Sequence, residues 1–451
     1  MPVQLNDLIK NSWTNKIGAN GKLKLALLSA GLGRRMDPLT VHHIPKPMFP
    51  LGGNTPMSEL WVRRAVEAGI TQISMNISVL KNTIKGHFKD GASFGATIEY
   101  IEEEIPSGTL GGICKQVFGA KAKQVYENEI IPSISEFKGT TVIAPSGDIV
   151  TNFNSELLER MYQIHKEKGA AFTMLLTPVP WEKRGEFGTV ALESHESLKG
   201  QISKSGKISA FLEKDPNSPS NLNNASVYMI EMDLLKTLDP LRTEAKVGLD
   251  EPFYDFGKHV FPAMLGKLDY ISLSKEYILW GLEYDGLWFD VGRKIDYLNV
   301  NKAVLDGKIK IDPPYEKYIW GFLGGDVAID FSKVTIIPPV IIGNGCIIEP
   351  GATIGPYAVI GDGWTIERGV TVKNSVLWKR YSFTTDTDHT IPANERKILD
   401  RHEIRRNVSI DECIIVGGTI EEDLFQKTVD VSENGDIEVL PIDWIPKGPR
   451  V

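Results

Sequence analysis

The chain has 451 residues with a formal net charge of -8, and 42% of its residues are hydrophobic. Its length suggests two or three domains, and its acidic balance gives no electrostatic basis for a nucleic-acid partner. The sequence indicates no signal peptide and contains no apolar run of roughly 18 residues, so we expect no membrane partner. The three cysteines, Cys114, Cys346 and Cys413, do not indicate a disulfide framework, and we therefore expect a cytoplasmic location.

A glycine-rich segment follows the first predicted strand, the apolar run at residues 23–28. This run has the pattern of a buried strand in a parallel sheet, and the carboxyl ends of such strands open into ligand crevices. Gly31 and Gly33 let the backbone approach an anion there, while Arg35 and Lys46 bring fixed positive charge to the same place. The segment is therefore expected to bind phosphate.

Further apolar runs alternate with helical stretches up to about residue 308, which predicts βαβ units. One connecting helix, at residues 59–68, is expected to be capped by Thr55 and stopped by Gly69. Three short strands without helices between them suggest a β-rich layer on the same α/β body. They lie at 188–192, 207–213 and 225–232. The other strands are expected at 70–77, 97–101, 140–144 and 171–176, and a last helix at 294–305.

Beyond that helix the aliphatic residues recur at a strict interval of six. The interval is kept by Ile342, Ile348, Ile354, Ile360, Ile366 and Val372. This period resembles the hexapeptide repeat of the left-handed parallel β-helix, in which three six-residue sides make one triangular coil. A polar stretch interrupts the repeat, and Ile410, Val416 and Ile420 indicate a last coil. Because open coils leave apolar side chains uncovered, we expect this part to mediate homo-oligomerisation or an allosteric contact.

The glycine-rich segment and its continuation resemble the two-part signature of the sugar nucleotidyltransferases, also called NDP-sugar pyrophosphorylases. That signature reads Gly-Gly-x-Gly-x-Arg-x-x-Pro-Leu-Thr followed by Pro-Lys-Pro-Met, and its counterparts here are residues 30–40 and 45–48. Ala30 replaces one glycine, and Arg34 stands where a small or hydroxyl residue is usual. A P-loop and a dinucleotide fingerprint fit less well, because Gly-Lys-Ser/Thr is missing and Met36 replaces a small residue.

The resemblance implies an α/β fold with a Rossmann-like, mostly parallel sheet, followed by a left-handed parallel β-helix. We therefore expect an N-terminal extension at 1–20, a nucleotidyltransferase catalytic domain at 21–308, a linker at 309–335, the β-helix at 336–432 with a loop insertion at 381–407, and a C-terminal tail at 433–451.

The resemblance also implies roles for single residues. The two family aspartates that hold Mg²⁺ correspond to Asp148 and Asp290, although an aspartate in a turn is more often structural when taken alone. The implied catalytic residues are Arg35, Lys46, Asp148 and Lys214. The implied nucleotide contacts are Ala30, Gly31, Gly33, Gly108 and Thr109, and the implied sugar contacts are Gly188, Glu213 and Asn224.

Three segments depart from the family or stay ambiguous. The Glu-Lys-Pro motif has Asp215 inserted before its proline, and Ser226 replaces the glycine of Asn-Ala-Gly-Ile-Tyr. Residues 255–258 resemble a segment of ADP-glucose pyrophosphorylases, but the match is too short to assign the sugar, and the segment could simply open a helix.

The implied reaction is Mg²⁺-dependent attack of a sugar 1-phosphate on the α-phosphorus of a nucleoside triphosphate, giving an NDP-sugar and pyrophosphate. Mg²⁺ is the expected cofactor, and the nucleoside triphosphate and the sugar 1-phosphate are the expected partners. Two alternatives stay open. The chain could be a regulatory or assembly subunit that binds nucleotide-sugar without turnover, or a bifunctional enzyme whose β-helix transfers acyl groups with His389 or His402 as base.

Overall fold

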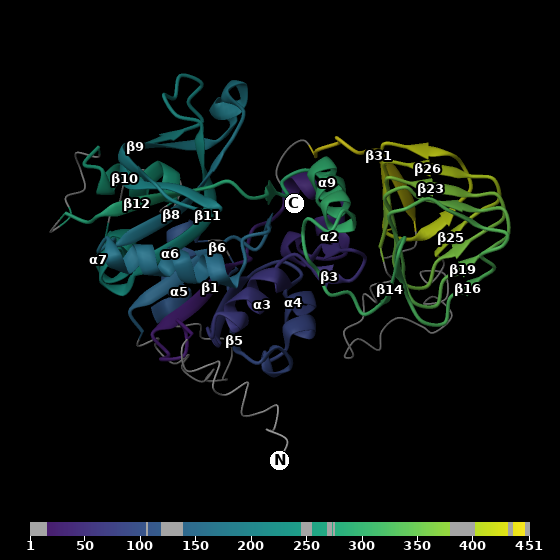
Figure 1. The fold of residues 1–451 in the computed structure, drawn as a ribbon, viewed down its shortest axis with the longest axis horizontal. Coiled ribbons are helices and arrows are strands. Elements are labelled where there is room, and N and C mark those ends of the chain that lie inside the picture. The colour runs from purple at the N-terminus through teal and green to yellow at the C-terminus, as the bar shows by residue number, and fades with distance from the viewer. Residues whose placement is uncertain are drawn as a thin grey trace, which may run out of the picture. The chain divides into compact units, whose positions relative to one another are not determined.

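The structure is a computed structural model that describes residues 16–104, 107–118, 139–244, 255–267, 273, 276–378, 402–431 and 436–446. The chain divides into two compact units (Figure 1). The first unit comprises Met1–Gly31, Trp61–Lys81 and His87–Trp288, and the second comprises Leu32–Leu60, Asn82–Gly86 and Phe289–Val451. Most of the glycine-rich signature therefore belongs to the same unit as the β-helix.

The first unit is built on a nine-stranded mixed sheet whose strand order is β5-β4-β1-β6-β11-β8-β12-β10-β9. Strands β5, β4, β1 and β6 run parallel, which confirms the expected Rossmann-like part of the fold. The expected β-rich layer is a continuation of this sheet, because β9, β10 and β11 pair with its other strands. The strands are β1 (Leu23–Leu28), β4 (Gln72–Ile77), β5 (Thr97–Glu102), β6 (Thr141–Pro145), β8 (Phe172–Pro178), β9 (Gly188–Ser197), β10 (Ile202–Glu213), β11 (Leu222–Glu231) and β12 (Leu279–Tyr284).

Helices connect and cover these strands. They are α3 (Glu59–Glu67), α4 (Lys81–Phe88), α5 (Gly108–Phe118), α6 (Ser155–Glu167) and α7 (Met232–Glu244). One buried core joins the apolar residues of α5 and α7 to the inner face of the sheet. None of the described helices is long and apolar enough to cross a membrane.

The start of α3 differs from the sequence prediction. Thr55 does not cap this helix, because Thr55–Pro56 forms β3, which pairs with β2 (Pro50–Leu51). The helix begins only at Glu59. Gly69 ends it as expected, with a φ of 80° that a glycine adopts without steric cost.

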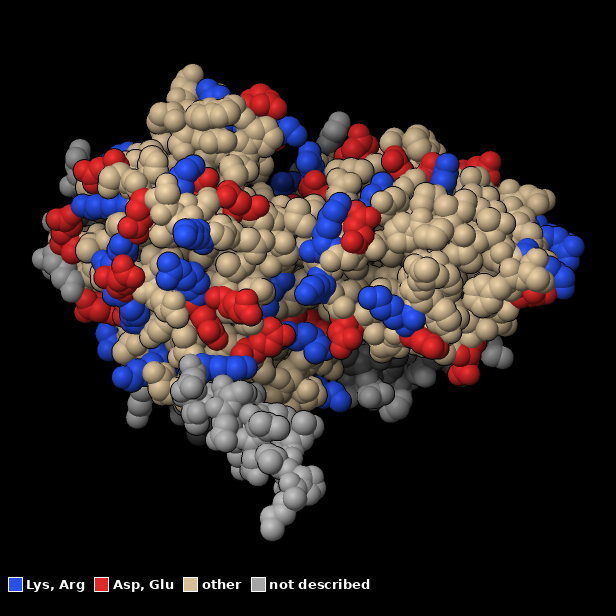
Figure 2. Space-filling model, in the orientation of Figure 1, with Lys and Arg blue, Asp and Glu red and all other residues tan. Residues whose placement is uncertain are grey.

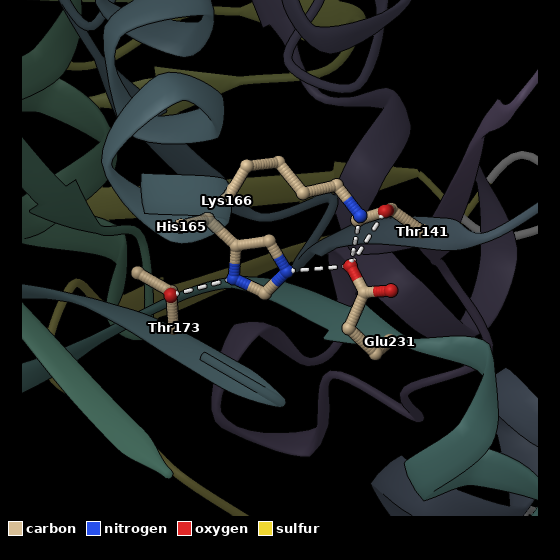
Figure 3. Close-up of polar contacts among 5 residues, drawn as sticks. All are labelled: Thr141, His165, Lys166, Thr173 and Glu231. Atoms are coloured by element: carbon tan, nitrogen blue, oxygen red, sulfur yellow. Dashed lines mark hydrogen bonds and ion pairs between the residues drawn. The ribbon is translucent and has the colours of Figure 1, made fainter. Parts of the chain in front are cut away.

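A partly buried polar cluster ties β6, β8, β11 and α6 together (Figure 3). Glu231 Oε1 accepts hydrogen bonds from Thr141 Oγ1 at 2.7 Å, from His165 Nε2 at 2.9 Å and from Lys166 Nζ at 2.5 Å. His165 Nδ1 lies 2.7 Å from Thr173 Oγ1. Thr141 begins β6 and Glu231 ends the antiparallel β11, so this cluster lies at the amino-terminal edge of β6.

The second unit contains the expected parallel β-helix, whose coils contribute strands in turn to three sheets. The first sheet contains β14 (Glu316–Tyr318), β15 (Gly321–Leu323), β18 (Val340–Ile342), β21 (Ala358–Ile360), β24 (Val376–Leu377), β27 (Ile414–Ile415), β30 (Lys427–Val431) and β31 (Ile437–Pro441). The second contains β16 (Ala328–Ile329), β19 (Ile347–Ile348), β22 (Thr365–Ile366), β25 (His402–Ile404) and β28 (Gly418–Ile420). The third contains β17 (Thr335–Ile336), β20 (Thr353–Ile354), β23 (Thr371–Lys373), β26 (Ser409–Asp411) and β29 (Leu424–Phe425).

The coils begin earlier than the six-residue pattern indicated. Gly321–Leu323 already pairs with β18, so part of the segment where we expected a linker belongs to a first coil. Ile329 pairs with Ile348 and Ile336 with Ile354, so the step between the two inward positions of this coil is seven residues rather than six. The interrupting segment ends before His402, since β25 already pairs with β22; residues 379–401 lie outside the described part of the chain.

One outer face of the β-helix is covered by its own unit. Ile341, Val359 and Val376 point outward from the first sheet but are at most 2% exposed. The β2–β3 segment covers this face, because a Cβ on Gly52 would lie 3.1 Å from Ile341 Cδ1. Helix α9 (Lys294–Leu305) holds that segment, since Asn301 Oδ1 accepts a hydrogen bond from Gly52 N at 2.9 Å.

Candidate active site

Asp148 lies beside the beginning of the signature in the first unit. Strands β1 and β6 are parallel neighbours, and their pairing continues past both strands as a bridge between Leu28 and Ser146. Gly147 N donates to Leu28 O at 2.8 Å. Asp148 is half-buried, and its Oδ1 accepts a hydrogen bond from Ser146 Oγ at 2.5 Å. The carboxylate and residues 29–31, which include the predicted nucleotide contacts Ala30 and Gly31, therefore emerge from adjacent strand ends.

In the second unit, the signature folds into short turns that bring Gly33 against Lys46. These turns are the 3₁₀ turn Arg34–Met36, α2 (Leu39–His42) and the 3₁₀ turn Lys46–Met48. Gly33 has a φ of 65°, and a Cβ there would lie 3.1 Å from Thr40 Cγ2 and 3.3 Å from Lys46 Cβ. Thr40 Oγ1 also donates to Asp37 Oδ1 at 2.6 Å. A glycine at 33 is thus required by both backbone conformation and space.

Arg35 meets the segment that carries Asp290, also within the second unit. Asp290 ends β13 (Trp288–Asp290) and is half-buried, while Arg35 is exposed. A Cβ on Gly292 would lie 2.9 Å from Nη2 and 3.1 Å from Cζ of Arg35. Gly292 therefore leaves the space in which the guanidinium lies, a requirement that the sequence alone did not reveal.

Within the first unit, the segment leading to Asp290 also reaches the strand that carries the predicted sugar contacts. Trp288 Nε1 donates to Ala225 O at 3.1 Å. Ser146 N donates to Ser226 O at 3.0 Å. Trp288 lies two positions before Asp290, and Ser146 lies two positions before Asp148. Both are thus hydrogen-bonded to β11, at the consecutive residues Ala225 and Ser226.

The same stretch of β11 is distorted around Asn224. Asn224 Nδ2 donates to Tyr228 Oη at 2.9 Å, and Asn224 Oδ1 accepts from Ser226 N at 3.0 Å. The register with β8 shifts between Asn224 and Tyr228, and Ser226 has a φ of 56°. Burial raises the pKa of Tyr228 to about 12. The bulge holds the amide and the neutral phenol in one hydrogen-bonded pair.

Glu213 lies against two glycines from different segments. A Cβ on Gly188 would lie 2.8 Å from Glu213 Oε2, and a Cβ on Gly257 would lie 2.9 Å from it. Burial and the nearby Asp255 raise the pKa of the Glu213 carboxyl. Asp255 opens a π-helical turn by accepting from Lys258 N at 3.0 Å. The sequence suggested residues 255–258 as a family-like segment or a helix start, and the position of Asp255 beside Glu213 was not predicted.

The two remaining predicted groups lie just after the end of β10 and at the start of α5. Lys214 follows Glu213 directly, is exposed and has a φ of 51°, and its backbone N donates to Phe187 O at 3.0 Å. Gly108 and Thr109 form the first turn of α5, where backbone N–H groups favour anions. Glu103, whose side chain is 1% exposed, accepts from Ser107 Oγ at 2.7 Å just before that turn. The sequence analysis did not single out Glu103.

His402 does not have the surroundings that an acyltransferase base requires. We expected it in a solvated loop, but it lies in β25, is buried, and packs its ring 4.9 Å from that of Trp364. A base for acyl transfer must reach a substrate in a cleft between coils. His389, the other histidine considered, lies outside the described residues.

Comparison with known proteins identifies the family. Residues 24–307 match the family model described as "Nucleotidyl transferase". The chain belongs to the nucleotidyl transferase family. It is 29% identical over 362 residues to the UTP–glucose-1-phosphate uridylyltransferase of Synechocystis sp., covering 79% of this chain and 83% of that protein. It is 26% identical to glucose-1-phosphate adenylyltransferase 2 of Vibrio parahaemolyticus, covering 62% and 66% of the two chains. It is also 25% identical to the mannose-1-phosphate guanylyltransferase of Mycobacterium tuberculosis, covering 74% and 78%.

The family model covers most of the candidate site residues described above in the two units. It includes the signature, Asp148, Glu213 and Asp290 and ends before the β-helix, which begins at Gly321. The surface drawn in Figure 2 shows interspersed basic and acidic side chains among the described residues on that face. This distribution differs from the basic stripe that is typical of nucleic-acid binding.

Proposed function

We propose that this chain transfers a nucleotidyl group from a nucleoside triphosphate to a hexose 1-phosphate and releases pyrophosphate. The observation that carries the proposal is the bonding of Ser146 and Trp288 to consecutive residues of β11. Asp148 lies two residues after Ser146 and Asp290 two residues after Trp288, a span of at most about 7 Å of chain in each case. The three relatives act on glucose 1-phosphate or mannose 1-phosphate by name, which supports a hexose 1-phosphate as acceptor.

Mg²⁺ fits the residues proposed to bind it. The described residues contain no group of three or more His, Cys, Asp or Glu side chains that could hold a metal. Magnesium at phosphate-transfer sites needs only one or two carboxylates besides phosphate oxygens and water. Asp148 and Asp290 are half-buried aspartates in loops or at a strand end, and would serve as those two ligands. The ion would neutralise charge on the phosphates and orient them.

The chain's own side chains supply the remaining charge and orientation. Arg35 and Lys46 would bind the phosphates of the triphosphate, and Lys214 the phosphate of the sugar. The backbone at Ala30, Gly31, Gly33, Gly108 and Thr109 would line the nucleotide. Glu213 and Asn224 would accept and donate hydrogen bonds to sugar hydroxyls, with Gly188 leaving room for the ring. Positioning of two anionic reactants is the main catalytic task in such a transfer.

The test is an assay for pyrophosphate with Mg²⁺, each of four nucleoside triphosphates, and a panel of glucose, galactose and mannose 1-phosphates. We expect at least one pair to release pyrophosphate. Asp148→Asn should lower kcat/KM by about 10²- to 10³-fold, because it removes a negative metal ligand. Asp285→Asn, at an exposed aspartate near β13, is the control and should retain activity.

The regulatory-subunit alternative makes the opposite prediction. Under that alternative no substrate pair releases pyrophosphate, while nucleotide-sugar still raises the melting temperature of the chain. The combined presence of Arg35, Lys46, Asp148 and Asp290 favours catalysis, because a binding subunit has no physical need for all four.

We also propose that the chain forms a homo-oligomer through its β-helix. Strands β16 and β17 of the first coil end their sheets among the described residues, which leaves edges able to pair or pack. Tyr318, Trp320 and Phe331 form an aromatic group beside these edges, with ring centroids 5.3 Å and 6.0 Å apart. Phe331 is 50% exposed. Such a surface is typical of a contact between copies.

A further inference from the structure

The segment that carries Lys46 is fixed at both ends by the β-helix, all within the second unit. On its amino-terminal side, His43 Nε2 is hydrogen-bonded to Asp430 Oδ1 of β30, and the two side chains are 2% and 3% exposed. On its carboxyl-terminal side, the ring of Phe49 packs against Trp378 with centroids 4.9 Å apart. Lys46 lies midway between these two anchors.

Trp378 reinforces both anchors. Its ring also packs edge-on to His43 at 6.3 Å. Its Nε1 donates to Tyr297 Oη at 3.1 Å, and Tyr297 Oη in turn donates to Pro50 O at 2.5 Å. A chain of buried contacts therefore runs from the β-helix through α9 to the residue that follows Phe49.

The turn between the anchors has little room to adjust. Met48 N donates to Pro45 O at 2.8 Å and Phe49 N to Lys46 O at 3.1 Å, so Lys46 lies within a closed 3₁₀ turn. Gly33 packs against Lys46 Cβ from the other side. A shift of His43 or Phe49 would thus move the backbone of Lys46.

The His43–Asp430 pair is costly to bury and distant in sequence. Burying an ionisable pair generally contributes little net stability, and such pairs are best explained where they fix one arrangement among alternatives. We propose that Asp430 is a positioning residue for nucleotidyl transfer, which acts through His43 to hold Lys46 against the phosphates. This inference rests on the proposed function of Lys46.

A second contact from the C-terminal segment also holds part of the candidate site in the second unit. Lys294, four residues after Asp290, is buried and donates from Nζ to Trp444 O at 2.7 Å. Nζ also lies 5.6 Å from the ring centroid of Trp444. Burial lowers the pKa of Lys294 to about 8, against the opposing effect of Asp37 and Asp443. Asp430 and Trp444 thus contact the segments that carry Lys46 and Asp290, respectively.

The experiment compares Asp430→Leu with Asp411→Leu, its control. Leucine has the same branching of side-chain heavy atoms as aspartate and cannot accept a hydrogen bond from His43. Asp411 is a β-helix carboxylate of β26 that bonds Asn374 and Lys373 rather than the Lys46 segment. Well below the melting temperature, Asp430→Leu should lower kcat by about 10- to 100-fold, because small misplacements of phosphate-binding groups cost that much. The KM for the sugar 1-phosphate should change much less. Asp411→Leu should retain the wild-type kcat.

Two further variants separate positioning from simple loss of stability. His43→Gln keeps a side-chain donor to Asp430 and should retain kcat within about threefold. In a Lys46→Arg background, Asp430→Leu should have a much smaller effect than in the wild type, since the two changes disturb one interaction.

Hydrogen exchange of the intact chain gives a readout that does not depend on activity. Amides of residues 43–50 should exchange faster in Asp430→Leu than in Asp411→Leu. A wild-type kcat in Asp430→Leu, or full additivity with Lys46→Arg, would overturn the positioning role. Failure of the wild-type chain itself to release pyrophosphate would instead count against the proposed function, while the exchange result would still decide whether Asp430 orders the segment.

Discussion

Ser226 is a single residue at which the backbone of the site is strained. It has a φ of 56°, a left-handed conformation that costs a non-glycine residue about 1 kcal/mol or more. It stands at the glycine position of the family motif Asn-Ala-Gly-Ile-Tyr that this segment resembles. Ser226→Gly should therefore raise the free energy of unfolding by about 0.5 to 1 kcal/mol, as measured by urea denaturation.

A strand position without a positive φ provides the control for this change. Ser209 lies exposed in β10, where glycine adds conformational freedom to the unfolded chain and removes one exposed hydrogen bond, from Ser209 Oγ to Ala191 O at 3.2 Å. Ser209→Gly should lower the free energy of unfolding by about 0.5 to 1 kcal/mol. Equal losses for both variants would show that the left-handed turn at 226 stores no strain.

For single residues, the sequence predicted which residues belong to the candidate site better than it predicted the contacts that require them. Gly33 was assigned to anion approach, and the structure adds that a Cβ there would be in tight contact with Thr40 and Lys46. Asp255 and Gly292 could not be assigned to the site, because their proximity to Glu213 and Arg35 depends on contacts between segments distant in sequence. A local pattern does not contain such contacts.

Among secondary-structure elements, the cluster around Glu231 fixes strand β11 to β6 and α6 (Figure 3). Burial alone would raise the pKa of Glu231, but hydrogen bonds from His165, Lys166 and Thr141 outweigh it and lower the pKa to about 2. The ionised carboxylate therefore favours the folded state at pH values above the pKa of about 4.5 that it has in an unfolded chain. This contribution is lost as the pH falls from there towards 2.

Glu231→Gln should accordingly destabilise the protein in a pH-dependent way. At pH 7 the free energy of unfolding should fall by about 2 kcal/mol, a value reduced for the partial exposure of the side chain. The difference from wild type should shrink between pH 4.5 and 2. Guanidinium denaturation at several pH values measures it, and Glu193→Gln, at an exposed glutamate of β9, should show no such trend. A constant difference down to pH 2 would contradict this account.

The elements with strong local periodicity were predicted well, and the irregular ones were not. The interval of six from Ile342 to Val372 located most coils of the β-helix, because each inward position repeats. The first coil was not predicted, because the seven-residue step from Ile329 to Ile336 breaks the six-residue interval. The short pairing of β2 with β3 was also missed, because its two prolines and its intervening glycines look like a helix start or a loop.

For the whole molecule, the main question is which apolar surfaces of the β-helix are already covered. The outward face at Ile341, Val359 and Val376 is buried, and the β2–β3 segment of the same unit contacts it at Ile341 and Val359. A charge placed there should act on folding. Val359→Asp should lower the free energy of unfolding by about 3 kcal/mol or more without changing the number of copies in the particle, because it leaves an unpaired charge in an apolar contact.

The aromatic group on the first coil should behave in the opposite way. Phe331 is half exposed, so Phe331→Asp should change the stability of the single chain by no more than about 0.5 kcal/mol. If a second copy covers this surface, the variant should dissociate to a particle of 50.0 kDa, whereas the wild type should have a multiple of that mass. Light scattering after size exclusion measures both masses. A wild-type mass equal to one chain would contradict the proposed homo-oligomer. If Phe331→Asp has the same multiple of that mass as the wild type, the contact between copies does not involve the first coil. Because Val359→Asp and Phe331→Asp introduce the same charge on the same β-helix, the comparison separates an internal contact from one between copies.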